Sequence, residues 1–467
     1  MEAAWSEPIK PPDEYLVLFC LLCVIKGILT PAICKCPIPL LLYPFMKLTR
    51  RQFIRSTAAT AVVAPNIIPS SAWANKPSNR VNLGFIGFGR MNSSHLNFFL
   101  GQADCRVTSI AEVARVRLDE AVKRVAGRYG EKHGCKAHND FRNTINDKSV
   151  DAVVIGTPDH WHAMPAIMAA DAKKDVYCEK PLTVTVRAAR ETLKAARRNN
   201  IVFQVGSQQR TEYGGRFRQA VECVRNGRIG EVKKVKIGVG APAVRCDLPT
   251  EPKPDGIDWE MWLGPSPERG FNKILCPVDM HKHFPQWRRY REYAGGGLSD
   301  MGAHHFDIAK WAMDLDETIP SKVIPPKTGN GGLRMIYENG VEFVHETTGD
   351  KFNDCVFYGS EGTLYVDRSG IDANPKTAIT SQFGKDAWRL PEIGNSHRRN
   401  WIDCIRSRKK PVADVSYGAH TSMVCSIANI GYETRSNLQW NPKTYGCNRK
   451  LGSGLSNRFG RGQWQYI

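Results

Sequence analysis

The sequence predicts a two-domain α/β protein: an N-terminal Rossmann-type, doubly wound parallel sheet, then an α+β domain with a large, mainly antiparallel open sheet. Two observations support this prediction. From residue 81 to residue 205, short apolar segments alternate with helical ones, as in a parallel sheet wrapped by helices. Beyond Gly227, short strand-like segments are joined by glycine-rich turns, which is typical of antiparallel sheets.

The expected elements follow this change of pattern. In the first domain, strands are expected at residues 81–86, 107–110, 152–156, 176–178 and 201–205, and helices at 90–100, 115–128, 163–172 and 186–198. In the second domain, strands are expected at 232–239, 334–337, 341–346, 355–358 and 362–366, and helices from Asp300 onward, at 397–406 and at 417–432.

The length of 467 residues is too great for a single hydrophobic core. We expect the first domain to span residues 75–207 and the second to span residues 208–440. A tail over residues 441–467 is rich in Gly, Arg and Asn, and we expect either a wrapping arm or a disordered segment there.

The N-terminal region carries the pattern of a twin-arginine export signal over residues 46–74. Arg50 and Arg51 precede an apolar stretch, and a small-residue cleavage site follows at residues 72–74. Because this route exports folded proteins, we expect a partnership with the twin-arginine machinery and a periplasmic or otherwise exported location.

Residues 1–45 precede a signal that is complete without them. We therefore predict that translation begins at Met46 and that residues 1–45 do not belong to the protein. The alternative is a membrane anchor, but the apolar run at residues 16–25 has only about ten residues, too few to span a bilayer. We expect no stable membrane span in the mature form.

Charge and cysteine usage narrow the class of protein. The net charge is +19, but no segment resembles a motif that reads DNA or RNA, so we expect a solvated basic surface and no nucleic-acid partner. The ten cysteines after the signal lack metal-ligand spacing, and we expect mostly buried free thiols and no metal site.

A glycine turn follows the first expected strand. Gly87-x-Gly89-x-x-Asn92 matches the first two glycines of the dinucleotide-binding fingerprint, and Asn92 replaces the usual third Gly or Ala. Glu112 stands 20 residues beyond Asn92, at the end of the second strand, where it suits ribose hydroxyls. Its charge favours NAD, whereas Arg115 and Arg117 leave NADP open. The alternative is a glycine turn that binds no nucleotide.

Two further segments carry candidate catalytic groups. Glu179-Lys180-Pro181 follows an expected strand, at the edge of the sheet where ligands bind. Asp300, His304 and Asp307 are spaced four and three residues apart, so a helix would present them on one face. A carboxylate one turn from an imidazole can orient it as a general base. The alternative is an N-capping Asp with a structural His pair.

These motifs together resemble the Gfo/Idh/MocA oxidoreductases, over roughly residues 80–440. The resemblance rests on the glycine turn, on the segment Thr157-Pro158-Asp159-His160-Trp161-His162, on Glu179-Lys180-Pro181 and on Asp300-x-x-x-His304-x-x-Asp307. It implies that Lys180, Asp300 and His304 are catalytic. Residues expected to contact the cofactor are Gly87, Phe88, Gly89, Arg90, Met91, Asn92, Glu112, Thr157, Pro158, His160, His162, Glu179 and Lys180.

The resemblance also implies a reaction: hydride exchange between a sugar or cyclitol carbon and a tightly bound NAD or NADP. His304 would take the hydroxyl proton while Asp300 holds its ring, and Lys180 would stabilise the reacting oxygen. Substrate contacts are expected from Asp307, Trp161 and Trp287, with Tyr290 and Tyr293 as further stacking candidates. A homo-oligomer is expected.

Two other functions fit the same residues. In the first, a bound NAD oxidises the sugar transiently, elimination cleaves a glycosidic bond, and the hydride returns, so the enzyme is a redox-neutral glycosidase. In the second, the chain is a non-catalytic sugar-binding protein with a vestigial site.

Overall fold

The computed structural model describes residues 80–278, 284–347 and 355–448, together with Arg461 and Trp464. The expected extension over residues 1–45 and the export signal over residues 46–74 lie outside the described residues. Within the described part of the chain, no helix combines the length and the apolar content needed to cross a membrane.

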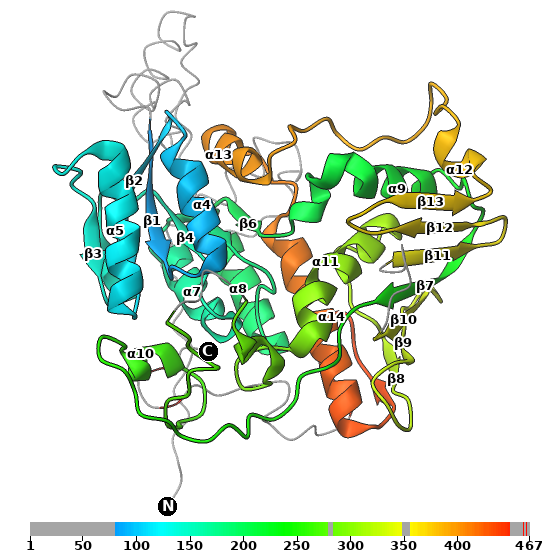
Figure 1. Cartoon of the computed structure of the whole chain (residues 1–467). Coiled ribbons are helices and arrows are strands. Elements are labelled where there is room, and N and C mark those ends of the chain that lie inside the picture. Colours follow the sequence, from blue (N-terminus) through cyan, green and yellow to red (C-terminus); the bar gives the residue numbers. More distant parts are fainter. Residues whose placement is uncertain (1–79, 279–283, 348–354, 449–460, 462–463, 465–467) are drawn as a thin grey trace, which may run out of the picture. The chain divides into compact units, whose positions relative to one another are not determined.

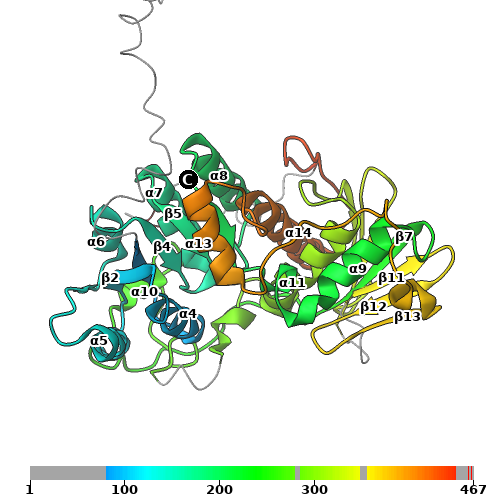
Figure 2. The same ribbon diagram turned by 90° about the horizontal axis from the view of Figure 1, so that it is seen from above.

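The first sheet is a six-stranded parallel sheet in the order β3-β2-β1-β4-β5-β6. Its strands are β1 (Val81–Ile86), β2 (Cys105–Ala111), β3 (Lys136–His138), β4 (Ala152–Ile155), β5 (Asp175–Cys178) and β6 (Phe203–Val205). Its helices are α4 (Arg90–Leu100), α5 (Arg115–Tyr129), α6 (Phe141–Asn146), α7 (Ala163–Asp171) and α8 (Val186–Arg198). Figure 2 shows α4 and α5 on one face of this sheet and α6 and α7 on the other.

Burial on both faces explains why the strands of this sheet read as continuous apolar runs. Along β4, Ala152 and Val154 join the hydrophobic cluster beneath α4 and α5, whereas Val153 and Ile155 join the cluster beneath α7 and α8. All four side chains are fully buried. A strand sandwiched in this way needs apolar residues at every position.

The second sheet has eight strands in the order β13-β12-β11-β7-β10-β9-β8-β14. They are β7 (Val232–Gly238), β8 (Lys322–Ile324), β9 (Leu333–Ile336), β10 (Glu342–Glu346), β11 (Cys355–Gly359), β12 (Thr363–Val366), β13 (Ile371–Asn374) and β14 (Leu438–Gln439). Every neighbouring pair is antiparallel except β7 and β10, which are parallel. The predicted fold class is therefore confirmed.

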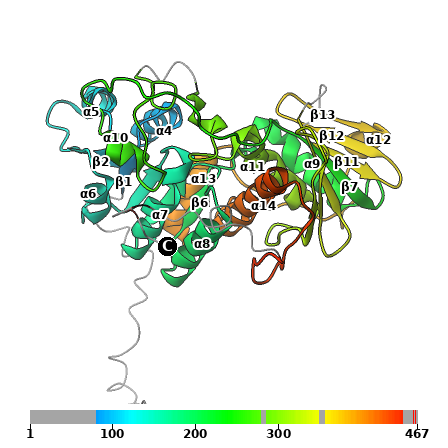
Figure 3. The same ribbon diagram turned by 90° about the horizontal axis from the view of Figure 1, so that it is seen from below.

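Helices of the second part of the chain pack on one face of this sheet (Figures 1 and 3). They are α9 (Arg216–Arg225), α11 (Gly296–Ala312) and α14 (Val415–Thr434). The short α12 (Thr377–Thr380) packs against β13 and α9, whereas α10 (Trp259–Leu263) and α13 (His397–Ser407) lie elsewhere. α13 packs on the first sheet, because Trp401 and Ile402 belong to the cluster beneath α4.

α11 is the element that brings the second domain to the edge of the first sheet. It begins at Gly296, whose φ of +71° is a conformation that favours glycine. A Cβ atom at Gly296 would lie 2.5 Å from the backbone nitrogen of Ala243, so a side chain there would push the neighbouring segment away. The close approach fixes where the first turn of α11, with Asp300, enters the site.

Candidate active site

A cavity of ≈ 340 Å³ lies at the carboxyl ends of β1, β2, β4 and β5. This edge is where the strand order reverses between β1 and β4, the place where open α/β sheets bind ligands. Parts of the other walls come from Asp300, Met301 and His304 of α11 and from residues 275–277, 284–285 and 287–288. The volume suits a small-molecule ligand, since such sites enclose roughly 300–1,000 Å³.

The glycine turn between β1 and α4 forms one wall of the cavity. Gly87 has φ +78°, and a Cβ atom there would lie 2.9 Å from the Thr157 methyl group. α4 begins directly after Gly89 and has neither a side-chain cap nor an acidic residue in its first turn. The cavity is lined here by Gly87, Phe88, Gly89, Arg90 and Met91, for which cofactor contacts stay a prediction.

Asn92, the unusual third position, does not line the cavity. It is fully buried, and its amide nitrogen donates to the carbonyl oxygens of Ile86 (3.1 Å) and Gly87 (2.6 Å). A Cβ atom at Gly156 would lie 2.4 Å from the Asn92 side chain, so Gly156 on the adjacent strand provides the missing space. The expectation that Asn92 contacts the cofactor is therefore replaced by a role in holding the turn.

Glu112 ties the end of β2 to the glycine turn. Its two carboxylate oxygens accept the backbone N–H groups of Phe88 (2.6 Å) and Ala114 (2.9 Å). Glu112 also lines the cavity, with the buried Arg117 guanidinium 3.9 Å away. Arg115 is exposed and pairs with Asp119, outside the cavity lining.

The loop after β4 contributes Thr157, Pro158 and His162 to the cavity. The ring nitrogens of His162 lie 2.7 Å from the Pro181 carbonyl and 3.0 Å from the Thr157 carbonyl. Burial lowers the pKa of His162 and so favours the neutral ring. This imidazole joins the loop after β4 to the loop after β5.

His160 is not in the cavity lining, contrary to the expectation that it contacts the cofactor. Its Nε2 lies 3.0 Å from the Trp262 carbonyl, and its ring packs against Trp262 and Tyr293. The ring is buried among side chains from residues 257–294.

Glu179 is a buried carboxylate at the end of β5 with several donors. His95 Nε2 and Gln208 Nε2 each lie 2.8 Å from Oε1. The Arg398 guanidinium donates to His95 Nδ1 (2.7 Å), so the proton of His95 sits on Nε2 and is shared with Glu179. Burial alone would raise the pKa of Glu179, but His95 and Lys180 outweigh it and lower the pKa to about 2.

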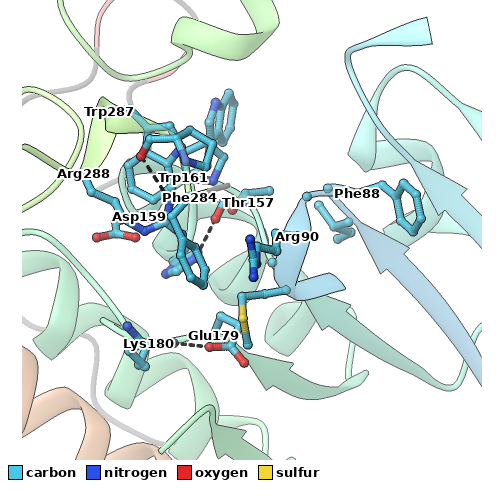
Figure 4. A pocket seen from close by; sticks show the side chains of 18 of the residues that line it. Phe88, Arg90, Thr157, Asp159, Trp161, Glu179, Lys180, Phe284, Trp287 and Arg288 are labelled. Atoms are coloured by element: carbon cyan, nitrogen blue, oxygen red, sulfur yellow. Dashed lines mark hydrogen bonds between the residues drawn. The ribbon is translucent and has the colours of Figure 1, made fainter. Parts of the chain in front are cut away.

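Lys180 and Asp300 form one of the contacts between the two domains inside the cavity. The Lys180 ammonium donates to the Asp300 carboxylate and to the Asp300 backbone carbonyl, both at 2.7 Å. Arg288 lies 3.6 Å from the same carboxylate oxygen. Burial would raise the pKa of Asp300, but these two cations hold it below its ordinary value. Figure 4 shows Lys180, Glu179 and Arg288 in this lining.

His304 lies one helical turn beyond Asp300 and also lines the cavity. We expected Asp300 to hold its ring, but that carboxylate pairs with Lys180 instead, because an ammonium ion attracts it more strongly than a neutral imidazole. His304 Nδ1 has no hydrogen-bond partner among the described residues. Burial, reinforced by the positive charges of Lys180 and Arg368, lowers the pKa of His304 well below its ordinary value.

The expected substrate contacts divide into two groups. Trp161 and Trp287 line the cavity (Figure 4). Asp307 does not: it is buried and accepts two hydrogen bonds from Arg210, at 2.8 and 2.9 Å. Its carboxylate neutralises a buried guanidinium, so sharing a helix face with Asp300 is not enough to reach the cavity. Tyr290 and Tyr293 are also outside the lining.

Several cavity residues were not singled out from the sequence: Asp159, Gln208, Arg288, Arg368 and Arg398. Asp159 lies inside the quoted segment 157–162, where its position after Pro158 was a usable signal. The others come from loops and from α13, and no local spacing marks them.

The cavity fits a nicotinamide dinucleotide. The uncapped start of α4 presents backbone N–H groups to an anion, and the glycine turn before it lines the cavity. Glu112, at the end of β2, stands where a ribose would lie. No group of side chains among the described residues could hold a metal ion.

Comparison with protein-family models gives two matches. A model described as an oxidoreductase family with an NAD-binding Rossmann fold matches residues 81–207, and one described as the C-terminal alpha/beta domain of the oxidoreductase family matches residues 241–466. Both models carry the Gfo/Idh/MocA name.

Three individual proteins that the chain resembles share less than a third of its residues over the aligned segments. The chain is 24% identical to a myo-inositol 2-dehydrogenase of Thermotoga maritima over 50% of this chain and 55% of that protein. It is 28% identical to an alpha-N-acetylgalactosaminidase of Shewanella oneidensis over 39% of this chain and 44% of that protein. The chain therefore spans about half the length of the curated relatives it matches. A levoglucosan dehydrogenase solved with NADH and levoglucosan shares the fold, with a TM-score of 0.53 and 20% identity over 77% of this chain and 99% of that one.

Proposed function

Because the chain belongs to the Gfo/Idh/MocA family of NAD-binding oxidoreductases, we propose that it exchanges a hydride between a hydroxyl-bearing carbon of a sugar or cyclitol and a nicotinamide dinucleotide. The observation that carries the proposal is the meeting of Lys180, Asp300 and His304 in the same cavity as the glycine turn. A nicotinamide bound there would supply the hydride acceptor. Side chains of the protein would accept and return the proton of the substrate hydroxyl.

Lys180 is proposed to bind the reacting hydroxyl oxygen. Its ammonium is held by two bonds to Asp300, which leaves a third N–H for the substrate. As the carbon loses a hydride and the hydroxyl loses its proton, this donor stabilises the negative charge that develops on oxygen. Asp300 acts through Lys180 by fixing the ammonium.

His304 is proposed to accept the hydroxyl proton. Burial keeps its ring neutral, and the residue lines the cavity, so its unprotonated ring nitrogen can serve as the acceptor. In the reverse direction the same ring would return the proton. Trp161 and Trp287 line the cavity and would supply apolar contacts to a sugar ring.

Glu112 supports NAD as the cofactor. Its carboxylate occupies the end of β2, where a ribose 2′-phosphate would meet negative charge. Of the two arginines that could bind such a phosphate, Arg115 and Arg117, only Arg117 lines the cavity. Its guanidinium donates to the Pro277 carbonyl and lies 3.6 Å from the Cys276 sulfur.

Tight retention of the cofactor and export with it form a further part of the proposal. The paired arginines at 50 and 51 suggest export of the folded protein, and little nicotinamide nucleotide is present outside the cytoplasm. The cofactor would then be regenerated in place, by a second substrate or by return of its own hydride.

The test uses the purified protein. We expect denaturation to release a stoichiometric nucleotide whose mass is that of NAD, and a sugar panel to reduce the bound nucleotide without addition of more. An empty protein that needs added nucleotide in every turnover would overturn retention, and a panel without any reduction would overturn the redox reaction.

A second candidate function has support from one comparison. The match to an alpha-N-acetylgalactosaminidase favours a redox-neutral glycosidase, in which oxidation, elimination and reduction occur at one bound cofactor. The products separate the two reactions. A free reducing sugar formed from a glycoside with no net change in cofactor would support the glycosidase, whereas a ketone product would support the oxidoreductase.

A further inference from the structure

Asp159 is a buried carboxylate in the cavity lining that the proposed chemistry leaves unused. It lies on a short turn, Asp159–Trp161, directly after the cavity residues Thr157 and Pro158. Its exposed fraction is 4%, and its Oδ2 has no hydrogen-bond partner among the described residues. A carboxylate oxygen left unpaired in such a place is costly, which indicates that a ligand group completes it.

Four charged side chains act on the pKa of Asp159: those of Arg288, Asp300, Lys180 and Glu179. The positive charges of Arg288, which has the larger effect, and of Lys180 lower the pKa of Asp159. The negative charges of Asp300 and Glu179 raise it. Burial outweighs these charges and raises the pKa of Asp159 to about 8. Near neutral pH the group is therefore a carboxylic acid, which can donate one hydrogen bond and accept another.

Arg288 is fixed beside this acid. Its guanidinium stacks 4.1 Å from the centroid of the Trp287 ring and lies 3.6 Å from the Asp300 carboxylate. Figure 4 shows Asp159, Arg288 and Trp287 together on the wall of the cavity. A stacking face, a cation and a neutral acid thus lie in one wall, close to Lys180.

We propose that Asp159 is a substrate-contacting residue that hydrogen-bonds a hydroxyl group of the sugar other than the one that reacts. This inference rests on the proposed function, because Lys180 is assigned to the reacting oxygen. A hydroxyl both donates and accepts, and the protonated acid matches it in both roles. Above the point where Asp159 ionises, its donor is lost and the sugar binds more weakly.

The experiment compares D159A and D159N in the full-length protein with its cofactor. Binding of myo-inositol and of levoglucosan is measured by calorimetry, and turnover by reduction of the bound cofactor. D159A should weaken sugar binding about 10- to 100-fold, the effect of an unpaired buried polar partner, with unchanged nucleotide content. D159N keeps a hydrogen-bond donor, so its affinity for the sugar should lie within about 5-fold of wild type below pH 7. Because an amide does not ionise, the affinity of D159N should not fall at high pH as that of wild type does.

The surface variant D119N serves as the control, since Asp119 is an exposed carboxylate on α5. The infrared band of a protonated carboxyl at pH 7 should be present in wild type and in D119N, and absent from D159N. Unchanged sugar binding by D159A, or no loss of that band in D159N, would overturn the assignment.

The same data separate this inference from the redox proposal. Sugars that bind through Asp159 but never reduce the cofactor would overturn the redox proposal alone. Sugars that are oxidised with unchanged affinity in D159A would overturn the Asp159 assignment alone. Failure of both sugars to bind wild type would count against both.

Discussion

Lys180 is held in place by a single residue of the other domain. Its ammonium makes two bonds to Asp300, one to the side chain and one to the backbone, so its position follows the start of α11. Partly buried ion pairs contribute little net stability, because the desolvation cost offsets the attraction. The pair therefore matters for the placement of the ammonium more than for the stability of the fold.

The first prediction concerns this ammonium. Lys180→Ala should lower kcat by about 1,000-fold, because the developing negative charge on the substrate oxygen loses its donor. Bound nucleotide should stay at the wild-type level when measured after denaturation. Lys194→Ala is the matched control, as Lys194 is 57% exposed on α8. Near-normal turnover in Lys180→Ala would contradict the assignment.

A second prediction follows from the pKa of Glu179. A carboxyl whose pKa falls from 4.5 to about 2 on folding stabilises the folded protein at neutral pH. At pH 7 its contribution is roughly 3 kcal/mol, and it is lost as the pH falls from about 4.5 towards 2. Urea unfolding of wild type and Glu179→Gln should therefore differ at pH 7 and converge in acid.

The control for this measurement is Glu231→Gln, since Glu231 is 70% exposed. A constant difference between wild type and Glu179→Gln across this pH range would show that the carboxylate is not the stabilising species.

The site residues show where sequence spacing suffices and where it fails. Spacing on a helix predicted that Asp300 and His304 share a face, and both do line the cavity. It could not predict that Asp300 would pair with Lys180, 120 residues away, or that Arg210 would bind Asp307. Such pairings depend on tertiary contacts that no local pattern encodes.

Among the elements, the turn between β1 and α4 shows how an imperfect motif is accommodated. The fingerprint usually has a small residue where Asn92 stands, so that helix and strand pack closely. Here the space comes from Gly156 on the neighbouring segment, and the Asn92 amide bonds the carbonyls of the turn. The absence of a side chain at Gly156 therefore compensates for the larger side chain of Asn92, and the turn keeps its conformation.

A double-mutant cycle tests this pair. Gly156→Ala should destabilise the protein by about 1–3 kcal/mol, because the new methyl group meets the Asn92 side chain. In an Asn92→Ala background the same change should cost about 1 kcal/mol less, which thermal or urea unfolding can resolve. Additive effects of the two substitutions would contradict the packing relation.

The elements themselves were largely predictable. β1, α4 and α8 have the predicted bounds, because each is a strong apolar or amphipathic run. The short elements β3, β8, β13, β14, α6, α10 and α12 were missed, since so few residues give no periodicity. The ten-residue helix α9 was missed as well. The parallel pairing of β7 with β10 was also not foreseen, because strand direction is set by the connections between strands rather than by composition.

For the whole molecule, the main feature is the set of contacts through which the second domain meets the first at the cavity. The Phe284 ring lies between two guanidinium groups, with Arg90 of the first domain 4.6 Å and Arg288 of the second 5.0 Å from its centroid. Arg117 of the first domain also bonds the Pro277 carbonyl of the second. We expect these contacts to slow the release of a bound cofactor.

Phe284→Ala should therefore release the cofactor faster. Two cation–π contacts of about 0.5–1 kcal/mol each correspond to a roughly 5- to 30-fold increase in dissociation rate. The rate is measured by exchange of the bound nucleotide for a labelled one. Trp388→Ala, which removes a similar contact with Arg225, is the control and should leave the rate unchanged. A dissociation rate in Phe284→Ala equal to that of wild type and of Trp388→Ala would show that Phe284 does not retain the cofactor.

Hydride transfer within the assembled cavity is the central claim for the molecule as a whole. The direct measurement is a single turnover with a sugar carrying deuterium on the reacting carbon, followed by denaturation and mass analysis of the released nucleotide. The account predicts a deuterium-labelled nicotinamide nucleotide from wild type and, when the reaction is stopped after one wild-type turnover time, an almost unlabelled one from Lys180→Ala. Consumption of the sugar by wild type with no label on the nucleotide, or with no nucleotide released, would contradict it.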